Sequence, residues 1–401
     1  MADTACLFLI LAAFTSTWGG LTYGSLQPVD IFLVGAILSL LVHSVFGRLH
    51  VRSSWWITVG ALTIFIVGIL HVAFPIDEAY KAGRFVLVTF LQDPTSQQAE
   101  GWVRGAQWLV AMAGIPILAC TLAGRNPSIV GRVALAWTAG AAVSGAVAIS
   151  DFLHITSVSN ALLGYVNATG RSSGLTAHPN TLGVSCAMAM SIAVYYIARR
   201  RLLGLAMFVS LAGGVIASGS RAAQVAVVLS LVFTLACSAK TRRRVLPVLL
   251  GASAVGIIIA FLSGPAALPD LGGIVRFTDA SAEVSDAGRA LVLQQGIHDF
   301  QYSPIIGVGL EYATSAHNIY IQMAAAGGVL LVCGLLAYFI GAITVGWRVR
   351  TVHPLSVHIL AALIVWLSAG IASNQLTDRF LYFPVACLAA LPYMLPRSSE
   401  A

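Results

Sequence analysis

Apolar stretches long enough to cross a lipid bilayer recur along the whole chain, and they constrain its fold more than any other feature. A helix needs roughly 20 apolar residues to span the hydrocarbon. Only 9% of the residues are charged, against about 25% in a typical soluble domain. Twelve such stretches occur, at 4–23, 28–46, 55–74, 105–123, 133–150, 180–198, 202–218, 222–239, 245–263, 318–346, 357–374 and 380–396. The sequence therefore predicts an all-α, polytopic membrane protein with twelve transmembrane helices, forming one membrane domain over residues 1–401.

The loops between these stretches alternate in charge. One set carries 14 of the 22 basic residues with two of the 15 acidic residues, and the other set carries the remaining 8 basic and 13 acidic residues. Because positively charged loops stay in the cytoplasm, both termini are predicted to lie on the cytoplasmic side of the inner membrane. The net charge of +7 thus reports topology and does not indicate a nucleic-acid partner. The longest loop, 264–316, is then extracytoplasmic.

The stretch SGSRAAQ (218–224) separates two of the apolar stretches. Basic clusters at 199–201 and 240–244 flank this pair on the cytoplasmic side, so SGSRAAQ is predicted to be the outer tip of a hairpin. Gly219 provides a residue that tolerates positive φ at the turn. Arg221 therefore lies on the face that otherwise excludes positive charge. Its position alone leaves two interpretations, a lipid-headgroup anchor or a substrate ligand.

Three other outer-face stretches contain similar polar residues. GRSSGLTAHPNTLG (170–183) leads into a span, with Asn180 as the predicted helix N-cap. HNIYIQMAAAGG (317–328) begins another span, with His317 at its mouth. In 285–309, a stripe at Ala290, Leu293, Ile297 and Phe300 predicts a short amphipathic helix at the membrane interface, capped by Ser285 or Asp286, with Arg289 in its first turn.

In their order and topology these motifs resemble those of the O-antigen ligase and polymerase family of membrane glycosyltransferases. The motifs are Arg171, Gly174 and Asn180; Ser220 and Arg221; Arg289, Pro304, Gly307 and Gly309; and His317 and Asn318. The resemblance implies transfer of a glycan from a polyprenyl-diphosphate carrier to a sugar or lipid-anchor acceptor at the outer face, without nucleotide sugar, metal or other cofactor. It implies that His317 and Arg221 are catalytic, that Arg171, Arg221, Arg289 and Arg276 bind the diphosphate, and that His178, Asn180, Ser220 and Asn318 support the site.

The residue types agree with this chemistry. Guanidinium groups stay charged and match phosphate oxygens in pairs, and Lys81 is the one lysine among the predicted outer-face residues. A histidine with a near-neutral pKa suits removal of the proton from an acceptor hydroxyl. Other interpretations remain for each residue: Arg289 pairs with Glu283 or Asp286 on the helix surface, and His317 merely caps its span. Asp151 and Asp378 are predicted to hold arginines in place.

The sequence does not separate a ligase from a polymerase, because both use the same donor and fold. The alternative from another class is a secondary transporter or a flippase for a lipid-linked or anionic sugar. Such proteins have ionisable residues at mid-membrane depth, or related halves with interrupted helices. The predicted spans are almost free of charge, which favours chemistry at the outer interface.

Overall fold

The computed structural model describes residues 2–22, 26–45, 50–77, 79–80, 83, 101–163, 170–247, 280–310 and 316–394. Within these ranges the regular structure is helical, without a β-strand. Seven of the described helices are long and apolar enough to cross a membrane. The prediction of an all-helical, multi-pass membrane protein is therefore confirmed, while the count of twelve spans stays a prediction. Most of the expected span 245–263, and Arg276, lie outside the described residues.

The long helices follow the predicted stretches closely. They are α3 (Trp55–Ala73), the continuous α5 (Gly101–Leu109), η2 (Val110–Gly114) and α6 (Ile115–Ala123), α7 (Ile129–Phe152), α9 (Pro179–Ile197), α10 (Arg201–Ser218), α15 (Ile319–Val349), and α16 (Leu355–Ala369) with η3 (Gly370–Ala372). Shorter apolar helices are α1 (Ala2–Thr15), α2 (Pro28–Val45), α11 (Arg221–Cys237), and η4 (Arg379–Leu381) with α17 (Tyr382–Ala390) and η5 (Leu391–Met394). Two further helices are α8 (Val158–Leu163) and α14 (Ala280–Tyr302).

The N-terminal helix is shorter than the stretch 4–23 predicts. The hydroxyls of Thr15 and Ser16 donate to the carbonyl oxygens of Leu11 and Ala13, and two glycines follow at 19–20. Such local bonds compete with helix propagation, and glycine is a poor helix former. The helix therefore ends at Thr15 although the sequence stays mostly apolar.

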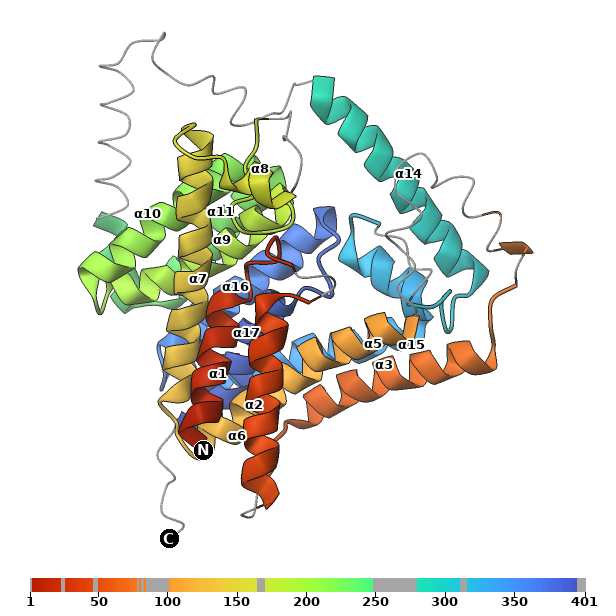
Figure 1. Ribbon diagram of the computed structural model, residues 1–401, viewed down its shortest axis with the longest axis horizontal. Helices are drawn as coiled ribbons and strands as arrows, with labels where there is room; N and C mark the ends of the chain where they lie inside the picture. Colours follow the sequence, from red (N-terminus) through yellow and green to blue (C-terminus); the bar gives the residue numbers. More distant parts are fainter. Residues whose placement is uncertain are drawn as a thin grey trace.

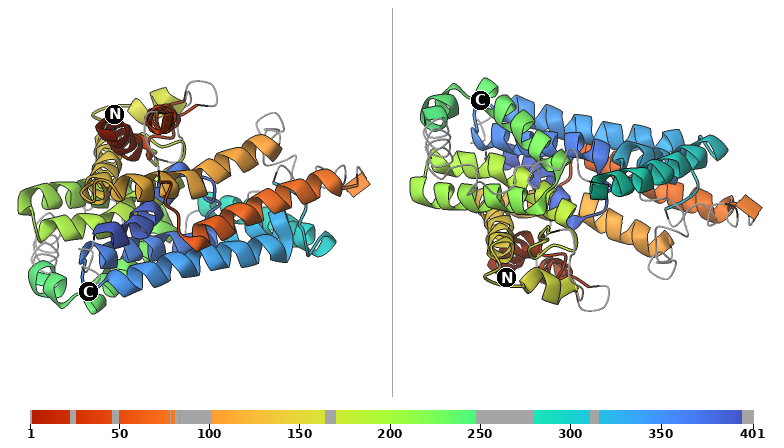
Figure 2. Two further views of the ribbon diagram at one scale, coloured as in Figure 1. Left: turned by 90° about the horizontal axis from the view of Figure 1, so that it is seen from below. Right: turned by 90° about the horizontal axis from the view of Figure 1, so that it is seen from above.

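The helices run in two main directions (Figure 1). In Figure 2, α1, α2 and α7 are seen nearly end-on, while α3 and α15 are seen lengthwise. Helix α7 packs on α1 and α10 through two glycines: a Cβ at Gly140 would lie 1.7 Å from the Phe14 carbonyl oxygen, and one at Gly145 would lie 2.6 Å from the Ser210 carbonyl oxygen. Small residues permit this close approach of helix backbones, as in other membrane helix pairs.

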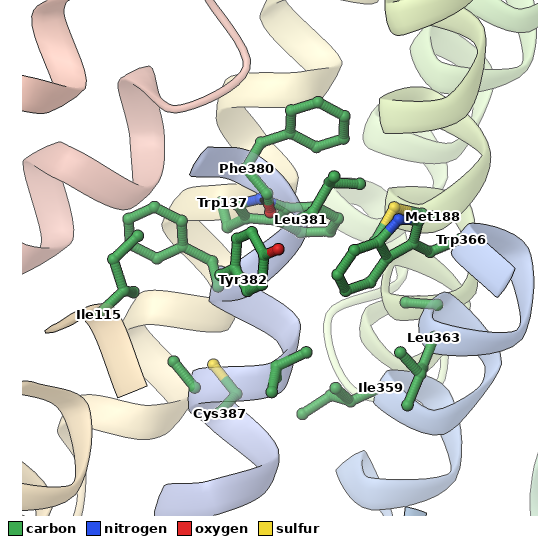
Figure 3. Close-up of a cluster of buried hydrophobic side chains, with 14 of the residues drawn as sticks. Ile115, Trp137, Met188, Ile359, Leu363, Trp366, Phe380, Leu381, Tyr382 and Cys387 are labelled. Atoms are coloured by element: carbon green, nitrogen blue, oxygen red, sulfur yellow. Dashed lines mark hydrogen bonds between the residues drawn. The ribbon is translucent and has the colours of Figure 1, made fainter. Parts of the chain in front are cut away.

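Buried aromatic side chains join α7, α16 and the η4–α17 segment (Figure 3). The indole of Trp137 donates to the Phe380 carbonyl oxygen at 3.0 Å, and the Tyr382 hydroxyl donates to the Leu376 carbonyl oxygen at 2.6 Å. The rings of Trp366 and Tyr382 meet edge to face, with centroids 5.2 Å apart. These large side chains bury their apolar surface while their polar atoms are bonded, as a water-poor interior requires.

The π-helical turn η2 has a clear cause in the sequence. Pro116 has no N–H and cannot donate to the carbonyl oxygen of Met112 four residues earlier. The Tyr338 hydroxyl donates to that oxygen instead, at 2.9 Å. Ile115 N–H bonds to the Val110 carbonyl oxygen, five residues back. A side chain from α15 thus completes a hydrogen bond that the proline removes.

Helix α15 is interrupted at Gly328, whose φ of 61° and ψ of −160° are not helical. The segment 304–309 lies in the break. Val308 N–H donates to the Ala325 carbonyl oxygen at 2.8 Å and Gly309 N–H to that of Ala326 at 3.1 Å. On the other side of the break, Val329 N–H donates to the Pro304 carbonyl oxygen at 2.8 Å. The PIIGVG motif therefore replaces the helical bonds that the interruption removes, and it ties α14 to α15.

We expect Gly328→Ala to destabilise the protein strongly. A Cβ there would lie 2.3 Å from backbone atoms of Ile305, and a backbone with positive φ and ψ near 180° is adopted almost only by glycine and costs another residue about 1–3 kcal/mol. The melting temperature of the purified protein measures the effect. Gly68→Ala is the matched control, because nothing lies within 4 Å of its added Cβ and alanine favours helix α3. Equal melting temperatures for the two variants would contradict the role of the break.

Candidate functional site

The turn between α10 and α11 is the predicted hairpin tip. Gly219 ends α10 in the left-handed conformation, with φ of 56°. The Ser220 hydroxyl caps α11 by accepting from Ala223 N–H at 3.5 Å. Arg221 is the first residue of α11 and is half-buried. The tight turn predicted at Gly219 is confirmed, while its position on the outer face stays a prediction. The turn places the cation of Arg221 at the positive end of a helix dipole, where it is disfavoured.

Arg171 lies against this tip. Its Nε donates to the Ser218 carbonyl oxygen at 2.7 Å, and its Nη2 donates to Asn180 Oδ1 at 2.5 Å. Beside it, Ser172 N–H donates to the Ala217 carbonyl oxygen at 2.9 Å. The segment that carries Arg171 is therefore bonded along the end of α10. Arg171 and Arg221 flank the same three-residue turn.

The N-cap of α9 is His178, so the prediction that Asn180 caps this helix is wrong. His178 Nδ1 accepts from Asn180 N–H at 3.1 Å, which places the ring proton on Nε2. The reason is Pro179: proline is favoured at the first helical position, so the capping residue precedes it. The Asn180 amide is then available to hold Arg171.

A series of polar contacts from the end of α7 and the start of α8 holds the loop before α9. Asp151 accepts from Val158 N–H at 2.9 Å and from the N–H and hydroxyl of Ser159. The Ser159 hydroxyl also contacts the Ser172 hydroxyl at 2.9 Å. The prediction that Asp151 holds an arginine is wrong, because its carboxylate is used to begin α8. A carboxylate that does hold an arginine is Asp30, which pairs with Arg379 at 3.0 Å.

Helix α14 begins at Ala280, so Ser285 and Asp286 lie inside it and do not cap it. Alanine and glutamate in 280–284 favour helix, and they extend it by more than a turn. Arg289 is therefore in the third turn, and it is half-buried. The face toward α15 includes Val292, Gly296 and Asp299, all buried. In the predicted apolar stripe, Ala290 and Ile297 are exposed, and Leu293 and Phe300 are half-buried. An apolar face that stays partly exposed is expected of a helix at the membrane interface.

His317 precedes α15 without capping it. The cap is Asn318, whose Oδ1 accepts from Tyr320 N–H at 3.0 Å and from Ile321 N–H at 3.1 Å. This removes the alternative that His317 merely caps its span. His317 adopts a φ of 48°, an uncommon conformation that clusters at functional sites. Its Nδ1 is buried and has no hydrogen-bond partner among the described residues.

The electrostatics show that residues from three segments lie close together. The pKa of His178 is lowered to about 4, first by desolvation, then by electrostatic interaction with Arg171, with His317 and with Arg289. His178 keeps an exposed surface, yet protein atoms crowd the ring enough for desolvation to dominate. The pKa of His317 is also lowered, by burial and then by Arg289. Both imidazoles are therefore neutral at pH 7.

The structure thus brings together most of the predicted site residues. Arg171, Asn180, Ser220 and Arg221 meet at the hairpin tip. Arg289 and His317 lie within electrostatic reach of His178. The contact between α14 and α15 positions Arg289 and His317, since Gly296 of α14 packs against Ala316 and Ile321. Sequence reasoning missed the link from Asn180 to Arg171, which no local pattern reveals because Asn180 was assigned to the helix cap.

We expect Asn180→Ala to weaken donor binding about tenfold or more, because it removes a hydrogen bond to a charged group and releases Arg171 Nη2 from its fixed position. Binding of a polyprenyl-diphosphate donor to the purified protein measures the effect. Thr181→Ala, on the next residue of α9, is the control and is expected to bind donor normally. Unchanged donor affinity in Asn180→Ala would contradict the role of Asn180.

A family model described as O-antigen ligase matches residues 205–336 of the chain. The match supports an O-antigen ligase family assignment. The matched segment runs from α10 into α15 and includes Ser220, Arg221, Arg289, His317 and Asn318, while Arg171, His178 and Asn180 precede it. No curated protein matches the chain. Together with the apolar helices, the O-antigen ligase model indicates a multi-pass membrane protein with a role in surface polysaccharide biosynthesis.

Proposed function

We propose that the protein transfers a glycan from a polyprenyl-diphosphate carrier to a sugar or lipid-anchor acceptor at the outer face of the cytoplasmic membrane. The proposal rests above all on the convergence of Arg171, Arg289 and His317 around His178. Arg171 and Arg289, with Arg221 at the same turn as Arg171, supply three cations beside the two neutral imidazoles, and this set suits a reaction that releases a diphosphate and removes a proton.

In the proposed reaction, the acceptor hydroxyl oxygen attacks the anomeric carbon of the donor glycan. The bond between that carbon and the carrier phosphate oxygen breaks, and its electron pair leaves with the diphosphate. Arg171, Arg221 and Arg289 stabilise the charge that develops on the phosphate oxygens, with Arg276 as a further ligand outside the described residues. His317 accepts the hydroxyl proton. Because the arginines supply the positive charge, we expect activity to persist in the presence of a metal chelator.

The supporting residues then have distinct roles. Asn180 orients Arg171, Ser220 begins α11 so that Arg221 stands at the tip, and Asn318 begins α15 so that His317 stands at its mouth. His178 carries its proton on Nε2, which leaves an N–H to donate to the donor or the acceptor. These supporting residues lie at or beside helix N-termini, which supports a reaction at a membrane interface.

The interruption of α15 bears on the transporter alternative, since broken helices are a feature of many transporters. In those proteins the unwound backbone lines the substrate site. Here the Ala325 and Ala326 carbonyl oxygens at the break accept from Val308 and Gly309 N–H. The break is filled by the chain itself, so it favours a structural role over a transport site.

Deletion of the gene, followed by analysis of lipid-linked and surface glycans, tests the proposal. Full-length chains that accumulate on the polyprenyl carrier would identify a ligase, and single repeats that still reach the surface would identify a polymerase. If carrier-linked glycans instead accumulated on the cytoplasmic face, the transporter alternative would replace the proposal.

A further inference from the structure

A second concentration of positive charge lies at the other end of α9 from His178. The turn from α9 to α10 and the segment that follows α11 carry seven basic residues, all with exposed side chains: Arg199, Arg200, Arg201, Lys240, Arg242, Arg243 and Arg244. We call these residues the basic cluster. A 19-residue helix is about 28 Å long, close to the roughly 30 Å of a bilayer's hydrocarbon core. The basic cluster and the candidate active site therefore belong to opposite membrane interfaces.

The two segments of the basic cluster are packed against each other. Val245 is buried against Val194 and Ile197 of α9. Arg244 Nη1 donates to the Ala198 carbonyl oxygen at 2.9 Å. These contacts join residues that lie more than 40 positions apart in the sequence, so the charges of one segment are held beside those of the other.

The loop between α15 and α16 adds a third element. His353 Nδ1 is buried and has no hydrogen-bond partner among the described residues. The pKa of His353 is lowered by burial and then by the positive charge of Arg199, which places this imidazole next to the basic cluster. The half-buried ring of His353 is thus a third polar element at the edge of the basic cluster.

Among the described residues, no acidic side chain balances these charges. The sequence has no Asp or Glu in 194–204, 237–247 or 347–358. Within the part of the chain that the structure describes, none of the basic cluster pairs with a carboxylate. Like charges within about 8 Å repel one another at physiological salt. The orientation of a membrane protein requires basic residues in its cytoplasmic loops, but it does not require that separate loops pack their basic residues side by side.

Exposed apolar side chains border the basic cluster. Leu202 has an exposed fraction of 84%, and Val352, next to His353, has one of 61%. A small soluble anion would leave this apolar surface uncovered. A phospholipid has both an anionic and an apolar part. Its phosphate pairs with guanidinium, and its acyl chains cover Leu202 and Val352.

We infer that the basic cluster, with His353, is a binding site for the phosphate headgroup of an anionic phospholipid. This lipid is separate from the glycan carrier, and it occupies the leaflet opposite the candidate active site. Basic pockets between membrane helices bind anionic headgroups in this way. The inference does not depend on the transferase reaction.

The purified full-length protein in detergent tests this inference through its melting temperature. Phosphatidylglycerol is expected to raise the melting temperature by at least about 2 °C, and phosphatidylcholine or inorganic phosphate is expected to leave it unchanged. The double variant Arg199→Gln/Arg243→Gln should lose most of this rise. Arg132→Gln, at an exposed arginine of α7, is the matched control and should keep it.

Three results would overturn the inference. Wild-type protein that is not stabilised by phosphatidylglycerol has no such site. Equal stabilisation by inorganic phosphate would indicate a site for small anions, and an equal loss in Arg132→Gln would indicate diffuse attraction. If the double variant does not fold, Arg199→Lys and Arg243→Lys keep the charge without the paired N–H donors. These variants, compared by native mass spectrometry, should retain less phosphatidylglycerol than wild type, and equal retention would contradict the site.

Discussion

Replacement of His317 by alanine is expected to lower turnover by about 10²–10⁴-fold, the usual contribution of a general base, while donor binding persists. His317 is suited to this role because its Nδ1 has no hydrogen-bond partner among the residues that the structure describes, and because burial and Arg289 keep its pKa below the ordinary value of 6.5. Turnover with a purified lipid-linked donor, measured beside donor affinity, separates the two effects. A variant that binds donor poorly but turns over normally at saturation would make His317 a binding residue.

The left-handed backbone at His317 calls for a second variant. His317→Asn also removes the base, and asparagine tolerates positive φ better than alanine does. Both variants should therefore lose turnover, whereas the alanine variant is the one that is destabilised by positive φ at position 317. His154→Ala is the matched control, because His154 is the other described histidine with positive φ, at 58°, and it lies outside the candidate site.

The dependence of turnover on pH follows from the same pKa shift. The neutral imidazole is the active form, so turnover falls as pH falls through the pKa of His317. Because this pKa is lowered, more than half of the plateau activity should remain at pH 6.5. In Arg289→Gln one cause of the lowering is removed, so the acid limb should move to higher pH. An acid limb that does not move would mean that Arg289 does not act on the base.

Much of the fold follows from the sequence because burial in a membrane depends on composition alone. The stretches 28–46, 55–74 and 202–218 match α2, α3 and α10 within about two residues, a normal uncertainty for helix ends. The turn at Gly219 was identifiable because glycine is the residue type that tolerates positive φ. The end of α1 and the start of α14 were not predictable from the apolar pattern. Hydrogen bonds of the Thr15 and Ser16 hydroxyls end α1 early, and the helix propensity of residues 280–284 extends α14.

The site was predictable as a set of residues but not as a set of contacts. Arg171, Arg221, Arg289 and His317 lie in separate stretches, and their shared location was implied only by a family resemblance. The contacts that join them are tertiary. Asn180 holds Arg171 because Pro179 moved the helix cap to His178. The loop 304–309 fixes α14 to α15 because Gly328 interrupts the helix.

Arg221→Lys is expected to lower turnover by about 10- to 100-fold, although it conserves the charge. Arginine presents paired N–H donors to phosphate oxygens, and lysine acts as a point charge; one hydrogen bond to a charged group contributes about 1.5–3 kcal/mol. The helix dipole and the nearby Arg171 both disfavour a cation at the first position of α11, where Arg221 stands. An anion in the same place benefits from both arginines and from the first N–H groups of α11.

The measurement compares turnover and donor affinity of Arg221→Lys with those of Arg132→Lys, the same exchange at an exposed arginine of α7. Arg132→Lys should match wild type. If the diphosphate is the ligand of Arg221, the lysine variant should also discriminate less between diphosphate and monophosphate carriers, because the guanidinium engages two oxygens at once. Full activity and full discrimination in Arg221→Lys would return this residue to its other interpretation, an anchor for lipid headgroups, and would leave Arg171 and Arg289 to bind the donor.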